Sequence, residues 1–294
     1  MQKIIVIVGP TGVGKTKLSI ELAKRLDAEI INGDSVAIYQ KLNIGSAKPT
    51  IEEQQEVPHH LIDIKHPTEE YSVYDYQVDG RKKIEELRKR GKNIIIVGGT
   101  GLYIKALLYD YRFTKGTTNN KYEELSNEEL YQKVKKLDEK IDIHPNNRKR
   151  LVRYLNKYEN NEEITHNKDK SLYDTLVIGL TLPRDILYER INTRVENMIK
   201  EGLVEEVEGL KKYYKSSRVL TTAIGYKEFI NYFTQKETLE EVVDKIKLDS
   251  RHYAKRQYTF FNHQLKTNWY QVNLDDFNKT IEKIYNDIKK EANN

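Results

Sequence analysis

The sequence predicts an α/β fold in which helices flank a parallel β-sheet, with an α-helical domain inserted into it. Short, almost wholly apolar runs at 4–8, 93–97 and 176–180 alternate with segments of helical periodicity. Such runs are typical of parallel strands that are buried on both faces. A glycine-rich turn follows the first run directly, and a polar stretch without strand patterns separates the second run from the third.

Composition sets the class of protein. The chain has 294 residues, of which 32% are charged and 38% hydrophobic, as expected for a globular protein of one or two domains. It has no apolar span of roughly 18 residues and no signal-peptide pattern, so we expect a cytoplasmic protein without a membrane partner. The absence of cysteine excludes disulfides and thiolate metal sites. The net charge of +5 is only a weak indication of a polyanionic partner.

The first elements follow from the apolar runs and their boundaries. Strand 4–8 is the run Ile-Ile-Val-Ile-Val, and periodic apolar residues after the glycine turn predict a helix over 15–26. A strand at 29–31 completes a βαβ unit. Helical spacing over 72–90 ends in a basic turn and a glycine, and the next run forms strand 93–97.

The region 114–171 is different, because it is polar, rich in Asn, Lys and Glu, and helical in character at 122–137 and 146–158. We predict a helical insertion there, which divides a core of residues 1–113 and 172–294. The remaining predicted elements are strand 176–180, helical stretches 184–213 and 238–265, strand 269–274 and a final helix over 275–291.

The turn after the first strand carries the strongest functional motif. Its sequence, Gly-Pro-Thr-Gly-Val-Gly-Lys-Thr, fits the phosphate-binding pattern G-x-x-x-x-G-K-[ST] between a strand and a helix, which makes the sheet P-loop-type. Backbone N–H groups converge on phosphate oxygens, while the lysine adds charge and the final hydroxyl can ligate Mg²⁺. The predicted di- or triphosphate site consists of Gly9, Pro10, Thr11, Gly12, Val13, Gly14, Lys15 and Thr16.

Two other strand ends carry polar groups. Asp34 follows the second strand, at the edge of the sheet where α/β proteins bind ligands. It is a candidate general base or outer Mg²⁺ ligand, or it is a turn aspartate. The apolar strand 93–97 ends in Gly98-Gly99-Thr100, without the aspartate by which P-loop ATPases and GTPases hold Mg²⁺. These glycines allow a ligand to approach, or merely let the next helix pack.

Cations cluster at three places. Arg190 and Arg194 are four residues apart on one helix face, which favours either a bound phosphate or a solvated charged surface. The cations of 147–153 and of the helix 238–265 can bind an RNA backbone, or are ordinary surface. The adjacent pair His59-His60 lacks the spacing of a zinc site, and we expect a structured loop over the crevice.

Several segments together resemble the bacterial tRNA dimethylallyltransferase family. They are the phosphate loop, Asp34–Tyr39, Ile44–Pro49, Pro58–Asp63, Val97–Tyr103, His144–Asn146, Ala223–Glu228 and Ala254–Gln257. They occur in order and at compatible spacing from residue 3 to about 265. The resemblance implies transfer of a five-carbon prenyl group from dimethylallyl diphosphate to the exocyclic amine of an adenosine beside the tRNA anticodon. The loop would then hold a diphosphate leaving group instead of ATP.

The resemblance also implies roles. Asp34 would be the general base, Thr100 would position the amine, and Arg194, with Arg190 and Lys15, would stabilise the diphosphate together with Mg²⁺ on Thr16. The RNA partner would be the anticodon stem-loop of tRNA, held by the insertion, with the target adenosine flipped out of its stack. We expect the protein to be a monomer. The implied RNA-contacting residues are Asp34, Ser35, Val36, Ala37, Thr100, Lys149, Arg150, Leu151, Val152, Arg153, Thr222, Ala223, Ile224, Gly225, Tyr226 and Lys227.

Departures and alternatives remain. Many relatives have Thr-Trp-Phe-Arg where this chain has Thr-Phe-Phe-Asn at 259–262, so one cation contact is missing. An adenylate isopentenyltransferase would use the same donor on a free nucleotide, and a small-molecule kinase would turn over ATP. A non-catalytic RNA-binding module would keep its RNA function without Asp34.

Overall fold

The computed structural model describes residues 3–113, 120–139, 141–160 and 170–292. It divides into two compact units, one made of Met1–Tyr109 with Ser171–Asn294 and the other of Asp110–Lys170. The predicted insertion, 114–171, covers nearly the same stretch as the second unit. Its residues 114–119, 140 and 161–169 lie outside the described part of the chain.

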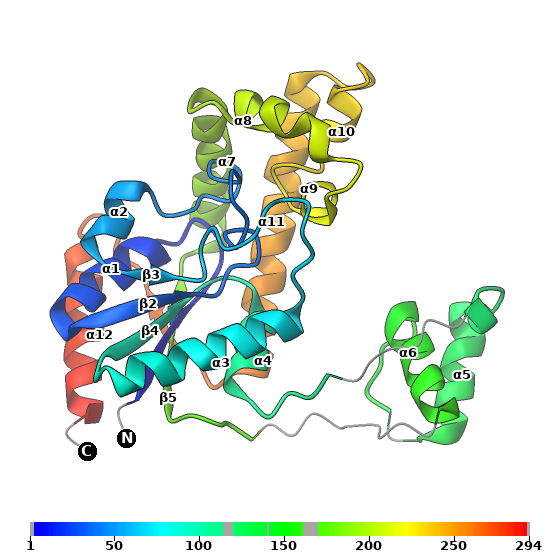
Figure 1. Cartoon of the computed structure of the whole chain (residues 1–294), viewed down its shortest axis with the longest axis horizontal. Helices are drawn as coiled ribbons and strands as arrows, with labels where there is room; N and C mark the ends of the chain where they lie inside the picture. Colours follow the sequence, from blue (N-terminus) through cyan, green and yellow to red (C-terminus); the bar gives the residue numbers. More distant parts are fainter. Residues whose placement is uncertain (1–2, 114–119, 140, 161–169, 293–294) are drawn as a thin grey trace. The chain divides into compact units, whose positions relative to one another are not determined.

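The first unit is built on a parallel sheet, which confirms the predicted α/β class (Figure 1). Within the described residues, six strands pair in the order β3-β2-β4-β1-β5-β6, and every neighbouring pair is parallel. The strands are β1 (Ile4–Val8), β2 (Ala28–Asn32), β3 (His59–His60), β4 (Asn93–Val97), β5 (Thr175–Thr181) and β6 (Asn268–Gln271).

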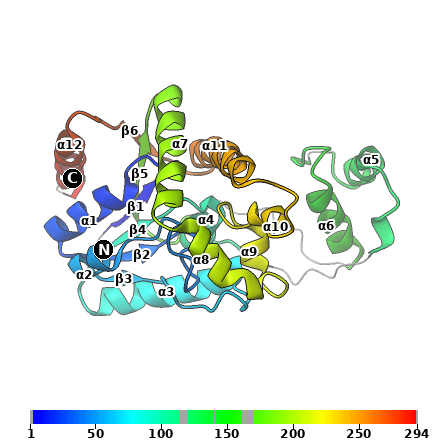
Figure 2. The same cartoon turned by 90° about the horizontal axis from the view of Figure 1, so that it is seen from above.

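Helices cover both faces of this sheet (Figure 2). Alternate side chains of β1 show the division, because Ile5 and Ile7 pack with the apolar faces of α1 and α12, whereas Val6 packs with α3, α4 and part of α11. The helices are α1 (Lys15–Leu26), α2 (Ile51–Glu56), α3 (Val73–Lys89), α4 (Gly101–Leu108), α7 (Arg184–Lys200), α8 (Leu203–Leu210), η2 (Lys211–Tyr213), α9 (Arg218–Thr222), α10 (Phe229–Tyr232), α11 (Leu239–Gln264) and α12 (Phe277–Ala292).

Several local predictions were wrong or incomplete. The stretch 184–213 is not one helix, because Gly202 adopts φ 101° between α7 and α8. The His59–His60 pair is not a loop over the crevice but the edge strand β3, and His60 Nε2 lies 2.7 Å from Glu29 Oε2 of β2. The last strand is shorter than predicted. Helices α2, α4, α9 and α10 were not predicted, since most are short and α4 is apolar on nearly every side.

The second unit contains η1 (Asn120–Tyr122), α5 (Asn127–Leu137) and α6 (Arg148–Glu159). A separate apolar cluster holds these elements together, with Leu130, Val134 and Leu151 fully buried. Arg148 donates hydrogen bonds to the carbonyl oxygens of Tyr122 at 2.7 Å and Glu123 at 2.8 Å. Its charge is therefore used to tie α6 to the segment before α5.

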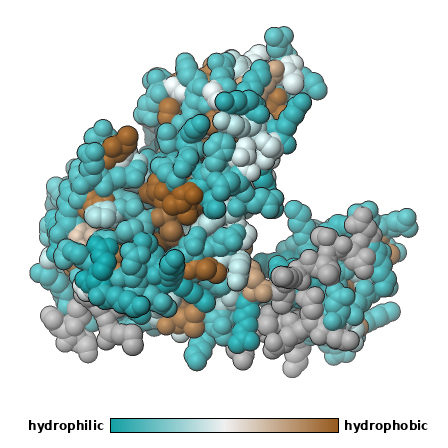
Figure 3. Space-filling view, viewed as in Figure 1, coloured by the Kyte–Doolittle hydropathy of each residue, from teal (hydrophilic) through white to brown (hydrophobic). Residues whose placement is uncertain are grey.

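Hydrophilic residues predominate on the molecular face drawn in Figure 3, where the hydrophobic patches are small. Among the described residues, none of the helices combines the length and the apolar character that crossing a bilayer requires.

Candidate active site

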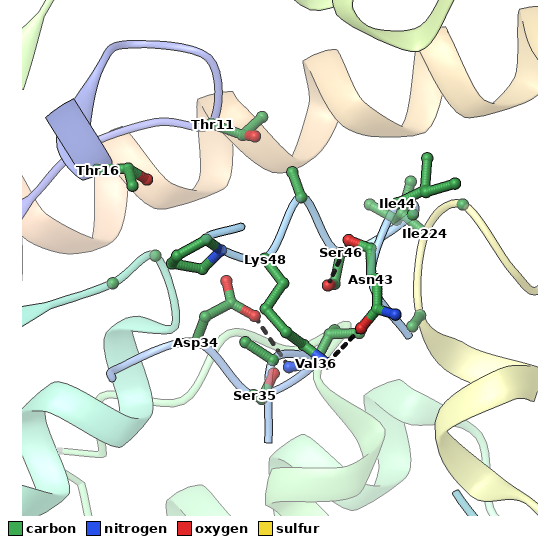
Figure 4. A pocket seen from close by; sticks show the side chains of 18 of the residues that line it. Thr11, Thr16, Asp34, Ser35, Val36, Asn43, Ile44, Ser46, Lys48 and Ile224 are labelled. Carbon is green, nitrogen blue, oxygen red and sulfur yellow. Dashed lines mark hydrogen bonds between the residues drawn. The ribbon is translucent and has the colours of Figure 1, made fainter. Parts of the chain in front are cut away.

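A cavity of about 1870 Å³ opens in the first unit, where the loops after β1, β2 and β4 meet α7 and α11 (Figure 4). Thr11 and Lys15 of the phosphate loop line it, together with Asp34 after β2 and Gly99 after β4. Arg194 of α7 lines it as well. The fold thus brings the predicted phosphate, base and arginine residues to one cavity.

The glycines of the phosphate loop are required by its backbone. Gly9 has φ 140°, and a Cβ atom there would lie 2.6 Å from the carbonyl oxygen of Leu180. Gly14 has φ 103°, and a Cβ atom there would lie 2.9 Å from the ring of Phe277. The loop therefore fits tightly between β5 and the start of α12, with little freedom to change shape.

Lys15 lies across this loop. Its ammonium group donates to the carbonyl oxygens of Gly9 at 3.0 Å and Pro10 at 2.8 Å. Burial and, to a smaller extent, the nearby charge of Arg194 lower the pKa of Lys15 to about 8. A phosphate anion at this position would oppose both effects, so the loop is electrostatically prepared for a strong anion.

Both arginines of α7 turn toward the loop, which favours the phosphate interpretation over a solvated face. Arg190 Nε donates to the carbonyl oxygen of Gly12 at 3.1 Å, and Arg194 Nη1 donates to Thr11 Oγ1 at 3.4 Å. Burial lowers the pKa of Arg194, and the Asp34 carboxylate raises it. In the described part of the chain, none of the ion pairs involves Lys15, Arg190 or Arg194.

The side chain of Asp34 is held in place by a turn that it helps to form. Its Oδ1 accepts the N–H of Val36 at 2.9 Å, and its own N–H donates to Asn32 Oδ1 at 2.9 Å. Asp34 is therefore a turn aspartate, as one of its interpretations had it, but its side chain also lines the cavity (Figure 4). One carboxylate oxygen supports the turn, which leaves the second to face a ligand.

Thr100 binds the same segment from the neighbouring strand end. Its hydroxyl accepts the N–H of Ser35 at 3.0 Å and donates to Ser35 Oγ at 3.2 Å. The two strand ends touch through glycine, since a Cβ atom on Gly98 would lie 2.2 Å from the Gly33 backbone. Packing therefore requires this glycine, and the same close approach places Thr100 beside the Asp34 turn.

Gln257 of α11 is a functional candidate whose role no local sequence pattern indicates. Its Oε1 accepts the N–H of Thr11 at 3.0 Å, and its Nε2 donates to the carbonyl oxygen of Gly99 at 3.0 Å. The buried amide thus connects the phosphate loop to the strand end that carries Thr100. Tyr253, one turn earlier, also reaches Gly99 at 3.3 Å, and burial together with Asp34 raises its pKa to about 12.

Comparisons with known proteins give the family. A family model described as IPP transferase matches residues 37–264. The tRNA dimethylallyltransferase of Anoxybacillus flavithermus is 44% identical over 300 residues, covering 98% of this chain and 96% of that protein. The chain belongs to the tRNA dimethylallyltransferase family. The family predicted from the sequence is thereby confirmed.

Solved structures of family members have the same fold. The full-length tRNA isopentenylpyrophosphate transferase of Bacillus halodurans aligns with a TM-score of 0.78 at 41% identity, covering 99% of this chain and 96% of its own. A eukaryotic dimethylallyltransferase, described as acting on tRNA, aligns with a TM-score of 0.77 at 29% identity, covering 92% and 74% of the two chains.

The segments expected to contact RNA differ in exposure. Ser35, Val36, Ile224 and Lys227 line the cavity, and Thr222 is exposed at its edge. Ala37 and Ala223 also line the cavity although their side chains are nearly buried, whereas the fully buried Tyr226 does not line it and supports the wall from behind.

The basic clusters also divide. On α6, Lys149, Arg150 and Arg153 are exposed, whereas Leu151 is fully buried in the second unit and Val152 is half-buried. On α11, Lys245 pairs with Glu237 at 2.5 Å and Lys247 with Glu196 at 2.7 Å. Those two α11 cations are already paired with carboxylates of the first unit, which weakens their interpretation as an RNA-binding cluster.

Proposed function

We propose that this protein transfers the dimethylallyl group of dimethylallyl diphosphate to the exocyclic N6 amine of the adenosine on the 3′ side of the tRNA anticodon, with release of diphosphate. The observation that carries the proposal is the meeting of Asp34 with the cations Lys15 and Arg194 in one cavity. The strand end at Gly98-Gly99-Thr100 lacks the aspartate that nucleoside triphosphatases use, which argues against ATP turnover.

The reaction balances with the groups present. The N6 lone pair forms a bond to C1 of the prenyl group, and the C1–O bond breaks with its electron pair passing to the diphosphate. The attacking amine becomes acidic as it acquires positive charge, and the Asp34 carboxylate accepts its proton, an effect worth about 10²- to 10⁴-fold in general base catalysis. Thr100, held beside the Asp34 turn, would orient the amine.

The departing diphosphate gains negative charge, and the cavity is arranged to receive it. Lys15 and Arg194 would exchange their present bonds to loop carbonyls and Thr11 for diphosphate oxygens. Among the described residues, no cluster of three acidic or histidine side chains forms a metal cage. Mg²⁺, which prefers substrate phosphates plus one or two protein oxygens, fits the Thr16 hydroxyl in that role and would neutralise charge there.

The RNA partner follows from the size of the cavity and the exposed cations. The cavity of about 1870 Å³ is far larger than a five-carbon donor needs and leaves space for a nucleotide extruded from its stack. Lys149, Arg150 and Arg153 would contact the backbone of the anticodon stem-loop. That the protein is a cytoplasmic monomer stays a prediction.

The test uses labelled dimethylallyl diphosphate and Mg²⁺ with unmodified tRNA, or with AMP as the acceptor. We expect label on tRNA alone. The matched control is the same tRNA with guanosine in place of the target adenosine, which removes the N6 amine and should abolish labelling. Label on AMP alone would indicate an adenylate isopentenyltransferase, and label on neither acceptor would overturn the proposal.

A further inference from the structure

Two segments form a wall of the cavity away from the phosphate loop. Residues Asn43–Lys48, in the connection after β2, line it, and so do all residues of Thr222–Lys227, from the last residue of α9 onward, except Tyr226. In Figure 4, Ile44 and Ile224 lie away from Thr11 and Thr16. We call these two segments the distal wall.

Glycines hold the two segments of the distal wall against each other. Gly225 has φ 91°, and a Cβ atom on it would lie 3.2 Å from the carbonyl oxygen of Gly45. A Cβ atom on Gly45 would lie 2.6 Å from the ring of Tyr226. The backbone at Gly45 thus lies directly on the buried Tyr226 ring, and the two segments form one continuous surface.

A single carboxylate fixes this arrangement. Glu206 of α8 accepts the N–H groups of Asn43 at 3.0 Å and Ile44 at 2.9 Å through Oε2. Its Oε1 accepts the N–H of Gly45 at 3.2 Å and the hydroxyl of Tyr226 at 2.7 Å. Consecutive backbone N–H groups around an anion are a strong, charge-assisted binding geometry.

The charges of the distal wall are satisfied internally. The ammonium group of Lys48 pairs with Asp63 at 2.5 Å and donates to the Tyr39 carbonyl oxygen at 2.8 Å, with its side chain 3% exposed. Together with the neutral side chains of Ile44 and Ile224, this leaves little free charge for a phosphate. A flat base with an apolar face fits such a surface better.

We propose that Glu206 is a positioning residue for the RNA acceptor, and that Asn43–Lys48 is a further segment that contacts an RNA base. The proposal rests on the proposed function. The short donor is tied to the phosphate loop by its diphosphate and extends roughly 5 Å beyond it, about four bond lengths. Because Ile44 and Ile224 of the distal wall lie away from Thr11 and Thr16 in Figure 4, we assign this wall to the acceptor part of the cavity.

The substitution Glu206→Gln separates this role from simple packing. Glutamine has the same shape, but its amide nitrogen would face N–H or O–H donors where an oxygen now accepts them. Because hydrogen bonds to a charged group are the stronger kind, we expect KM for tRNA to rise about tenfold, with kcat and KM for dimethylallyl diphosphate changed less than about twofold. The matched control is Glu205→Gln, an exposed neighbour on α8 with the same loss of charge.

Two measurements do not depend on turnover. Hydrogen exchange should accelerate in the peptide containing Asn43, Ile44 and Gly45 of Glu206→Gln, while peptides of β1 and β4 stay protected. The dissociation constant of an anticodon stem-loop RNA should rise by the same factor as KM for tRNA. If the wild type binds this RNA but does not prenylate it, the proposed function fails while this inference is still tested.

The outcomes are decisive. An unchanged KM and unchanged RNA binding in Glu206→Gln would overturn the inference, as would a rise confined to KM for the donor. If Glu206→Gln fails to fold, Tyr226→Phe replaces it, since it removes one of the four hydrogen bonds and keeps the ring under Gly45. That variant should weaken RNA binding in the same direction by a smaller factor, and no weakening would count against the proposal.

Discussion

The phosphate-loop end of the cavity and the distal wall treat charge in opposite ways. Lys15, Arg190 and Arg194 are satisfied mainly by carbonyl and hydroxyl oxygens, so their positive charge remains largely uncompensated. At the distal wall, Glu206 is surrounded by four donors and Lys48 is paired with Asp63. The cations at the phosphate-loop end can bind an anionic ligand. The charged groups at the distal wall are paired within the protein and fix the shape of the wall.

This difference teaches how one cavity can bind two unlike substrates. A strong anion needs cations that are not already paired with carboxylates. Burying such cations is costly, and this burial lowers the pKa values of Lys15 and Arg194. A base needs a rigid surface of the right form, which internal hydrogen bonds provide. Substitutions at each end test whether the two ends act separately.

The largest effect is expected from Asp34→Asn, which acts on neither end alone. Asparagine keeps an oxygen for the N–H of Val36 and so preserves the turn, but it cannot accept the proton of the amine. We expect kcat to fall about 10²- to 10⁴-fold with tRNA binding retained. Single-turnover kinetics measure it, with exposed Asp275→Asn as the control. A variant that loses donor affinity but turns over normally would show that Asp34 is not the base.

Arg194→Gln should have the next largest effect, confined to the phosphate-loop end. Losing one cation that faces the leaving group is expected to cost about 10²- to 10³-fold in kcat/KM for the donor, with KM for tRNA unchanged. Arg190→Gln is the comparison, and it should cost less because Arg190 is exposed. A matching loss of tRNA affinity would break the distinction between the ends, and equal losses in the two variants would show that the burial of Arg194 does not make it the more important cation.

Glu228→Gln tests the distal wall through stability. Burial raises the pKa of Glu228 to about 7, although its carboxylate accepts the N–H of Gly225 at 2.9 Å and faces Lys227 and Asp249. The unfolded chain loses this proton near pH 4.5 and the folded chain near pH 7, so stability from this group falls as pH rises across that window. Glutamine has no titrating proton and so removes this loss of stability at higher pH.

The expected gain of Glu228→Gln over the wild type is therefore near zero below about pH 4 and grows to an upper limit of about 3 kcal/mol above about pH 7. Urea unfolding at several pH values measures it. Exposed Glu240→Gln provides the control and should give a nearly constant difference. A pH-independent difference for Glu228→Gln would mean that the carboxyl is not held protonated in the fold.

The smallest effect concerns the pH dependence of diphosphate binding. Since the pKa of Lys15 is about 8, this lysine is charged below that pH and must take up a proton to bind an anion above it. Affinity for inorganic diphosphate should fall by up to tenfold per pH unit above about pH 8. Below that pH, the titration of Lys15 should change the affinity little. Calorimetry against Lys15→Arg, which stays charged, isolates this contribution. The same slope in both proteins would exclude Lys15 as its source.

The sequence predicted the sheet and the phosphate loop well, because both have local signals. Fully apolar strands and the spacing of Gly9–Thr16 are visible without knowledge of tertiary contacts. Asp34, Thr100 and Arg194 were found through strand ends and family resemblance, and the structure brings them to one region.

The rest depended on contacts between distant residues. Glu206 lies in an ordinary amphipathic helix, and nothing local marks it as the acceptor for a segment more than 150 residues earlier. Gln257 likewise acts through Thr11 and Gly99, which no periodicity connects. His59 and His60 were misplaced because a two-residue strand has too little pattern to recognise.

The order of the strands also bears on aggregation. The five- and seven-residue strands lie inside the sheet, while its two edges are β3, with two residues, and β6, with four. A short edge offers few unpaired N–H and C=O groups to a strand from another molecule. Lengthening β3 by replacing the polar residues around His59 and His60 with β-branched ones would therefore create a template for intermolecular pairing, and the brevity of this edge protects the fold at high concentration.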